Sequence, residues 1–309
     1  MIRLIIILMG FNFADYLGGF AGSSFRYSTN ARDMALGNTL ISEHNEGFNA
    51  FSNPALLSRV AYNEIGASQF SMSLDRYIQA FSFSQSLSDN AGASISFFNS
   101  GVSNIDGRDL YNNSTGSFSS NEGYLMLSFG ARINQKMDIG LNIKTIFNKI
   151  DQYSANGISA DIGMIYNFSD EISVSLVVDD LFGEYSWEGL NETSASFKQS
   201  LPAVSSLGLS YKVNESITAL SKIDYMNPDD LNLFRFSSGI EIERDLYMFR
   251  AGAIQSNGIN NKSIEAKLML GVGSYIEVFQ NRIIRLDYCI DFGRKNEGIN
   301  NLFSISFIK

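Results

Sequence analysis

The residues best suited to chemistry in this sequence are its single histidine and its adjacent pairs of carboxylates. A hydrolase needs a base within hydrogen-bond reach of its serine, and His44 is the only imidazole that the chain offers. His44 precedes the strand-rich part of the chain, so we predict that it is a hydrogen-bonded polar residue and that the protein is not an enzyme. The pairs Asp179-Asp180 and Asp229-Asp230 fall at expected strand ends, where they indicate solvated turns or at most a weak Ca²⁺ site.

The one cysteine of the chain, Cys289, excludes an intrachain disulfide. It lies between Asp287 and Asp291 in a segment of alternating polarity. We interpret it as a small residue that fills a packed interior rather than as a reactive thiol. These residue types lead us to expect no cofactor and no metal ion.

The charge and hydropathy of the chain limit its partners. The 309 residues carry a formal net charge of −9, whereas a protein that binds nucleic acid needs clustered Lys and Arg. The mean hydropathy is −0.02, and no apolar stretch reaches the length of a membrane-spanning helix. Because a β-barrel exposes only alternate residues to lipid, this average is also compatible with a barrel in a membrane.

The first residues have the pattern of an export signal. Arg3 provides a basic start, and residues 4–9 form an apolar core that is too short to span a membrane. Small residues place the cleavage after Ala14, or as late as Ala21. We therefore predict a signal peptide over residues 1–14, with a buried first strand as the alternative.

From Glu64 onward the apolar residues recur with a period of two. In residues 137–150, for example, Leu141 and Ile143 share one face while Asn142 and Lys144 share the other. Similar segments continue to the C-terminus and give about fourteen strands of roughly ten residues, the length that a tilted strand needs to cross a bilayer. We predict an all-β fold, an antiparallel transmembrane β-barrel over residues 61–309, with an exported sandwich or solenoid as the alternative.

The expected connections alternate between short turns and longer loops, as they do in outer-membrane barrels. The short ones are residues 89–90, 134–136, 169–170, 214–215 and 244–245. The longer ones, rich in Gly, Asn and Ser, are residues 101–121, 151–156, 181–200, 227–230 and 256–261. Residues 273–282 break this alternation unless they contain further strand.

Charged side chains collect on the face opposite the apolar one. A cation on the lipid side of a barrel costs about 2–4 kcal/mol at the bilayer midplane, so these residues must point into the lumen. Because their signs are mixed, we predict a network of ion pairs across a mostly filled interior. Its main members are Lys144, Asp161, Arg235, Arg250, Lys267, Arg285 and Asp287.

The segment ahead of the strands contains a short helix signal. Asn53 is a good helix cap and Pro54 suits the first helical position. A helix this short cannot bury itself, so it must pack into another surface, and the nearest is the mouth of the barrel. We predict that residues 22–60 form a plug inside the barrel, entered from the periplasmic side, and that Arg32 pairs there with an inward acid.

This segment resembles the N-terminal signature of the PorV/PorQ family, outer-membrane barrels related to the FadL-type transporters of hydrophobic compounds. The similarity rests on an Ala-Arg-x-Met-x-x-Gly run, an acidic pair at Glu43 and Glu46, and an Asn-Pro-Ala run. It departs from the family pattern at Ser52, which replaces a Trp, and at Leu56, which replaces a Gly. The resemblance implies a fourteen-stranded barrel and a plug or gate formed by Arg32, Met34, Gly37, Asn53, Pro54 and Ala55.

The resemblance implies two functions for a barrel located in the outer membrane among its lipids. The first is a secretion-associated or surface-attachment component that binds secreted proteins or secretion-system subunits through external loops. Phe182, Tyr185 and Trp187, in the expected loop 181–200, are candidates for that contact or for an interfacial aromatic girdle. The alternative is a FadL-like channel for hydrophobic small molecules, with residues 31–60 as its gate.

Overall fold

The computed structural model describes residues 20–188, 197–228, 232–257, 264–278, 282–293 and 298–309. The predicted signal peptide, residues 1–14, lies outside the described residues, and so do Asp229 and Asp230. Among the described residues, no helix has the length and apolar character needed to cross a membrane.

The described strands form one antiparallel sheet that closes on itself. Fifteen strands are present, and fourteen of them make the ring, since β8 pairs with β7 beside it. Strand β1 closes the ring by pairing with β15, and β6 pairs with β7. The strands are β1 (Glu64–Met72), β2 (Arg76–Ser88), β3 (Ala91–Arg108), β4 (Ser114–Asn134), β5 (Met137–Ile150), β6 (Tyr153–Asn167), β7 (Ile172–Trp187), β8 (Phe197–Ser200), β9 (Val204–Asn214), β10 (Ile217–Met226), β11 (Leu233–Arg244), β12 (Tyr247–Asn257), β13 (Ile264–Val278), β14 (Arg282–Asp291) and β15 (Asn300–Ile308).

The predicted alternation of polarity is confirmed on the strands of the ring. In β5, Ile143 is 52% exposed on the outer surface, while Asn142 and Lys144 are buried on the inner side. Exposed large apolar residues recur on the outward faces of the other strands, as with Phe81 on β2 and Phe303 on β15. A continuous outward apolar surface is what a bilayer-spanning barrel presents to lipid. The fold prediction, a closed antiparallel barrel of fourteen strands, is therefore correct.

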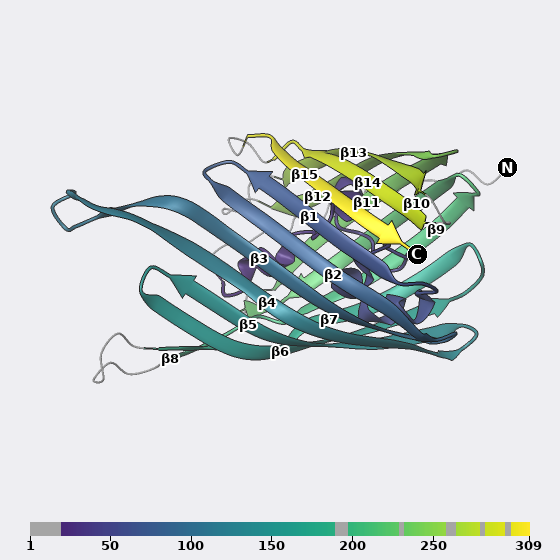
Figure 1. The fold of residues 1–309 in the computed structure, drawn as a ribbon, viewed down its shortest axis with the longest axis horizontal. Helices are drawn as coiled ribbons and strands as arrows, with labels where there is room; N and C mark the ends of the chain where they lie inside the picture. Colours follow the sequence, from purple (N-terminus) through teal and green to yellow (C-terminus); the bar gives the residue numbers. More distant parts are fainter. Residues whose placement is uncertain (1–19, 189–196, 229–231, 258–263, 279–281, 294–297) are drawn as a thin grey trace.

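The two ends of the barrel differ, but less simply than the sequence suggested. The short connections predicted from the sequence lie at one end, called here the short-turn end, and the β3–β4 hairpin projects far beyond the opposite end (Figure 1). That opposite end also has short connections, between β1 and β2 and between β5 and β6. Most of the expected loop 101–121 is strand, because β3 continues to Arg108 and β4 begins at Ser114. The expected loop 151–156 is wrong too, since only residues 151 and 152 separate β5 from β6. Both faces of the β3–β4 ribbon are largely exposed there, so pairing continues without the apolar alternation that marks a half-buried strand.

The anomalous connection at residues 273–282 has a simple explanation. Strand β13 runs to Val278 and pairs with β14 from Arg282 onward. The segment therefore contains further strand, which restores the expected alternation of connections.

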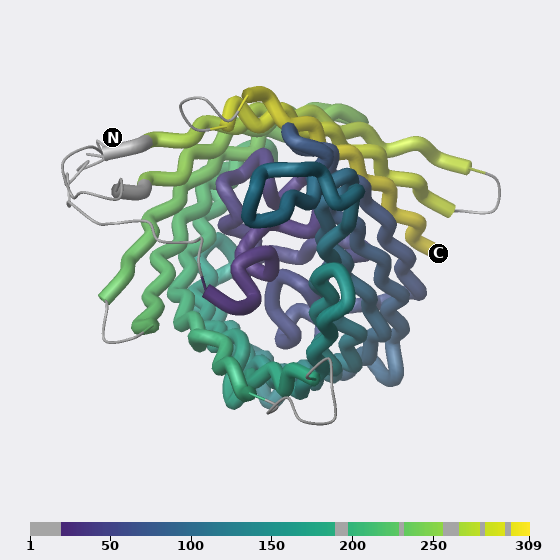
Figure 2. The backbone as a smooth tube through the Cα atoms, turned by 90° about the vertical axis from the view of Figure 1, so that its left-hand side faces the viewer, coloured from purple at the N-terminus to yellow at the C-terminus, as the bar shows by residue number. Residues whose placement is uncertain are grey.

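The N-terminal segment fills the interior of the barrel. It contains η1 (Ser23–Arg26), α1 (Ala31–Ala35), α2 (Asn49–Ser52) and η2 (Pro54–Arg59), and the purple tube in Figure 2 lies within the ring of strands. Oδ1 of Asn53 accepts a hydrogen bond from the amide of Ala55 at 2.9 Å, so the predicted cap is confirmed. The helix that it begins is a 3₁₀ helix. We refer to residues 22–60 as the plug.

Glycines on the inner wall let the backbone of the plug touch the strands directly. A Cβ atom on Gly140 would lie 2.2 Å from the carbonyl carbon of Pro54, and one on Gly163 would lie 2.0 Å from Oδ1 of Asn53. Both distances are far below van der Waals contact, so any side chain there would displace η2. The inward glycines that meet the plug in this way are Gly66, Gly92, Gly130, Gly140, Gly163, Gly208, Gly239, Gly252 and Gly271.

Candidate functional site

An irregularity in β7 turns a carboxylate of the wall into the lumen. Between Val178 and Leu181, β7 has two residues where β6 has one, so the strand is bulged. Asp180, within this bulge, and Phe182, in the register shift that follows it, adopt positive φ angles of 58° and 57°. As a result Asp180 points inward and its side chain is fully buried, while Phe182 points outward and is 92% exposed.

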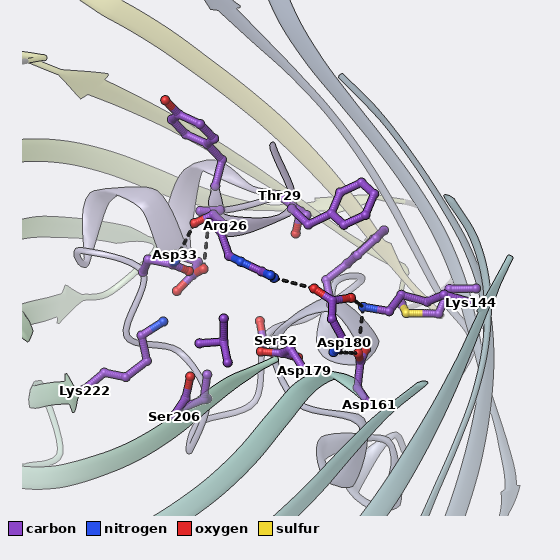
Figure 3. Close-up of a pocket in the computed structure, with 18 of the residues that line it drawn as sticks. Arg26, Thr29, Asp33, Ser52, Lys144, Asp161, Asp179, Asp180, Ser206 and Lys222 are labelled. Carbon is purple, nitrogen blue, oxygen red and sulfur yellow. Dashed lines mark hydrogen bonds and ion pairs between the residues drawn. The ribbon is translucent and has the colours of Figure 1, made fainter. Parts of the chain in front are cut away.

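Asp180 joins the plug to the wall. Its Oδ1 lies 2.5 Å from Nζ of Lys144 on β5, and its Oδ2 accepts a hydrogen bond from the guanidinium of Arg26 in the plug (Figure 3). Lys144 also lies 2.6 Å from Asp161 on β6. The expectation that the carboxylates of residues 179 and 180 are solvated turn residues is therefore wrong for Asp180, because the bulge turns it into the lumen.

A second cluster joins the plug to strands β11 to β14. Nη2 of Arg32 lies 2.6 Å from Oε1 of Glu241, and Arg285 forms an ion pair with Glu46 of the plug. Burial disfavours the charged form of Glu46, but the guanidinium groups of Arg285 and Arg32 outweigh it and lower its pKa to about 2. Charges of both signs alternate in the cluster, which consists of Arg32, Glu46, Glu241, Arg250, Arg285 and Asp287.

A third anchor lies where β1 begins. Oε2 of Glu64 accepts hydrogen bonds from the amide of Gly47 at 2.8 Å and from Nδ2 of Asn49 at 2.9 Å. Its Oε1 lies 2.9 Å from Nε2 of His44. Burial opposes protonation of His44, but its hydrogen bond to Glu64 and the charge of that carboxylate raise its pKa. His44 is thus a hydrogen-bonded polar residue of the plug.

The remaining predicted lumen residues also pair inside the barrel. Lys267 lies 2.6 Å from Asp291, and Arg235 lies 2.6 Å from Asp224. Nζ of Lys222 lies 3.3 Å from the same Asp224. Cys289 is fully buried in the hydrophobic core between plug and wall.

The other plug residues singled out in the sequence make packing contacts. Met34 is buried in the core beside the wall, and Ala55, in η2, is buried in a cluster with Ile165 of β6. Gly37 has a φ of 75°, and its amide nitrogen lies where a side chain on Gly252 would have to go. Met34, Gly37 and Ala55 therefore lie at the contact between the plug and the inner wall of the barrel.

The predicted loop aromatics do not form one exposed surface. Tyr185 and Trp187 lie on β7, which continues to Trp187 and pairs there with β8, and both side chains are buried in the hydrophobic core. Nε1 of Trp187 donates a hydrogen bond to Gln199 at 3.0 Å. Their expected loop position is thus wrong, and Phe182 is the one of the three that remains exposed.

Several anchoring residues were not singled out in the sequence. Asp138 on β5, fully buried, accepts hydrogen bonds from Arg59 of the plug at 3.0 Å and from Arg132 at 2.9 Å. It shares the even-numbered, inward register of Lys144, so the alternation alone could have identified it. No such signal was present in the sequence for Asp180 or Arg26. A bulge breaks the alternation of polarity at Asp180, and the plug sequence around Arg26 has no periodic pattern of polarity.

A pocket remains between the plug and strands β4 to β11. Its volume is about 70 Å³, roughly half that of the 150 Å³ apolar cavity that admits benzene. Aromatic rings line one part of it, and charged and hydroxyl groups line the rest (Figure 3). In this arrangement the plug leaves no room for a drug-sized molecule to pass through this pocket.

The architecture is similar to that of solved outer-membrane channels. The structure titled "CymD monoaromatic hydrocarbon channel" is 12% identical, with a TM-score of 0.68, over 91% of this chain and 97% of that one. A Pseudomonas aeruginosa FadL homologue is 11% identical (TM-score 0.63; 91% and 98% covered). The Ralstonia pickettii toluene transporter TbuX is 12% identical (TM-score 0.61; 90% and 96% covered). No family model matches the chain, and no curated protein matches it.

Proposed function

We propose that this protein is a non-enzymatic outer-membrane channel for hydrophobic small molecules, with the plug as its gate. The observation that carries the proposal is a fourteen-strand barrel whose lumen is filled by its own N-terminal segment. Proteins described as hydrocarbon channels and a toluene transporter share this architecture over nearly their whole length. The outward apolar surface and the predicted signal peptide support a place in the outer membrane, with the short turns facing the periplasm.

Charges in the lumen are the main argument against a hydrophobic solute. Most of them are neutralised by partners: Arg26 and Lys144 by Asp180, and Arg250 by Glu241 and Asp287. The inner wall also has a pair of aromatic rings, since Phe98 on β3 stacks on Tyr124 on β4 at 5.0 Å, and Phe25 of the plug meets Tyr124 edge to face at 4.9 Å. An apolar solute therefore has a surface to follow once the plug shifts.

A secretion or attachment role is a second candidate, supported by the similarity of the plug sequence to the PorV/PorQ pattern and by the tip of the β3–β4 hairpin. Leu110 and Tyr111 are 101% and 87% exposed there. Oδ1 of Asp109 accepts hydrogen bonds from the amides of Tyr111 and Asn113, which orders the turn. Such a surface suits contact with a secreted protein or a secretion-system subunit.

The channel function is tested by uptake into cells. The chain would be produced in a Gram-negative host that lacks its own hydrocarbon channel, and uptake of radiolabelled toluene would be measured with the empty vector as background. We expect uptake above that background, with no change when Leu110 and Tyr111 are both replaced by Ser. If toluene uptake stays at background while the two-residue variant loses a captured secreted protein, the attachment role is the correct one.

A further inference from the structure

Within the described residues, the half-buried carboxylate of Glu122 on β4 has several hydrogen-bond donors but no cation beside it. Its Oε2 accepts a hydrogen bond from Oγ of Ser24 at 2.5 Å. Its Oε1 accepts hydrogen bonds from the hydroxyl of Tyr185 at 3.1 Å and from Nδ2 of Asn148 at 3.2 Å. The fourth donor is the amide of Gly22, whose nitrogen lies 3.0 Å from Oε1. These donors stabilise the carboxylate, but none of them neutralises its charge.

Gly22 is held firmly at the point where the plug enters the barrel. It is buried, and its φ of 68° is one that glycine adopts without strain. A Cβ atom on Gly22 would lie 3.0 Å from the side chains of both Leu201 and Phe25. Leu201 lies just ahead of β9, at the end of the barrel opposite the short-turn end. The nitrogen of Gly22 is therefore fixed beside Glu122 at that end.

The peptide bond before Gly22 has the sequence pattern of a signal-peptide cleavage site. Such sites carry small residues at the first and third positions before the bond, and Ala21 and Gly19 occupy these positions. The earlier candidate site, after Ala14, has the larger Asn12 at its third position. The pattern of small residues therefore favours the later site.

We propose that the mature chain begins at Gly22 and that its terminal ammonium group forms an ion pair with Glu122. Hydrolysis by a signal peptidase adds the hydroxyl of water to the carbonyl carbon of Ala21 and a proton to the nitrogen of Gly22. The new amine takes up a second proton at neutral pH, because the pKa of a free α-amino group is about 8. The nitrogen that lies 3.0 Å from Oε1 of Glu122 then carries a positive charge. Such a charge-assisted hydrogen bond is roughly twice as strong as a neutral one.

The ammonium group also brings more donors than the peptide group that it replaces. A peptide nitrogen carries one hydrogen, whereas a terminal ammonium carries three. Oδ1 of Asn148, on the side chain whose Nδ2 donates to Glu122, is buried and has no hydrogen-bond partner among the described residues. Cleavage removes Phe20 and Ala21, which are both only partly buried. The mature chain therefore exchanges two partial packing contacts for an ion pair that fixes the start of the plug to β4.

The first measurement determines where the mature chain begins. The full chain would be produced in a Gram-negative host and purified from its outer membrane, and its first residues would be read by N-terminal sequencing. We expect the sequence Gly22-Ser23-Ser24. A chain that begins at Asp15, or at any other residue, would overturn the proposal.

The second measurement is the pKa of the terminal amine in the folded protein, obtained from the pH dependence of its reaction with trace acetic anhydride. We expect Glu122 to raise this pKa from about 8 to about 9, because an adjacent negative charge favours the ammonium form. Glu122→Gln should return the pKa to about 8. Heat-modifiable migration on gels establishes that each variant is folded.

Glu188→Gln is the matched control, since it removes the same charge from an exposed position just beyond β7, at the same end of the barrel. It should leave the pKa of the terminal amine raised. An ordinary pKa of this amine in the wild type, or a raised pKa that persists in Glu122→Gln, would show that the ammonium does not pair with Glu122.

Discussion

His44 and Glu64 join the plug to the first strand of the barrel, with 2.9 Å between Nε2 of the imidazole and Oε1 of the carboxylate. The other oxygen of Glu64 accepts two further hydrogen bonds from the plug, so one strand residue holds three plug residues. Glu64 lies where the chain passes from the plug into the barrel. If the plug moves, it must therefore either pivot about Glu64 or break the hydrogen bonds that Glu64 makes.

The His44 anchor should weaken as the pH rises. The folded state raises the pKa of His44 above the ordinary value of about 6.5 for histidine, so the protonated form stabilises the fold. This contribution is fully present below about pH 6.5 and is lost as the pH rises through the raised pKa. We expect His44→Gln to destabilise the protein on the order of 1 kcal/mol at about pH 5.5 and by less at about pH 9. Denaturant unfolding at both pH values checks this. If His44→Gln destabilised the protein more at the alkaline pH than at the acidic pH, the predicted direction of the pH dependence would be wrong.

Glu46→Gln should show the opposite pH dependence. The pKa of Glu46 is lowered from 4.5 to about 2, so its contribution is present above 4.5 and declines as the pH falls toward 2. We expect a loss of about 2 kcal/mol in the free energy of unfolding at neutral pH, since Arg32 and Arg285 each lose a partner. Glu171→Gln, at an exposed turn, is the control and should have little effect. An equal loss at both ends of the pH range would rule out the ion pairs as its cause.

Substitution of Asp180 should lower the free energy of unfolding far more than substitution of the adjacent Asp179. Asp180 is fully buried and pairs with Arg26 and Lys144, so Asp180→Asn leaves two cations short of a partner. We expect that variant to lose about 3–5 kcal/mol and Asp179→Asn to lose less than about 1 kcal/mol. Unfolding in guanidinium chloride measures both. Similar losses for the two variants would mean that Asp180 does not join the plug to the wall.

Gly140→Val should displace the plug without opening the barrel. The new side chain would collide with the backbone of Pro54 and Ala55, which cannot move aside without shifting η2. We expect a cost of about 1–3 kcal/mol and faster cleavage of the plug by added protease, while the barrel keeps its heat-modifiable migration. Ala131→Val, on the outward face of β4, is the matched control. If the plug resists protease equally well in both variants, the close contact at Gly140 does not hold the plug in place.

Much of the barrel could be predicted from sequence because a bilayer imposes a strict alternation on every strand that crosses it. Strand β5 illustrates this: Leu141 and Ile143 face outward, and Asn142 and Lys144 face inward. The signal weakens beyond the band of exposed apolar residues: the β3–β4 ribbon is wet on both faces, and register shifts precede the end of β7, where Tyr185 and Trp187 are buried. That is why Tyr185 and Trp187 looked like loop residues.

The site was less predictable than the fold. The cap at Asn53 and the inward direction of Lys144 follow from local rules. The position of Asp180 depends on a bulge, and a bulge is set by the pairing of two strands rather than by the residues of one. The inward glycines were visible in the sequence, but only the path of the plug explains why Gly140 and Gly163 need to lack a side chain.

The central claim is that the plug moves when a solute passes, and a cross-link tests it most directly. Oγ of Ser42 in the plug lies 2.7 Å from Oγ of Ser175 on β7, and both residues are buried. Cysteines at these two positions, in a Cys289→Ala background, are close enough for a disulfide between plug and wall.

Uptake of radiolabelled toluene would be measured in cells that carry the Ser42→Cys/Ser175→Cys variant, before and after reduction, with each single cysteine variant as control. We predict that the oxidised double variant shows only background uptake and that reduction restores it, while the single variants respond to neither treatment. Uptake at the wild-type rate by the fully oxidised double variant would contradict a moving plug.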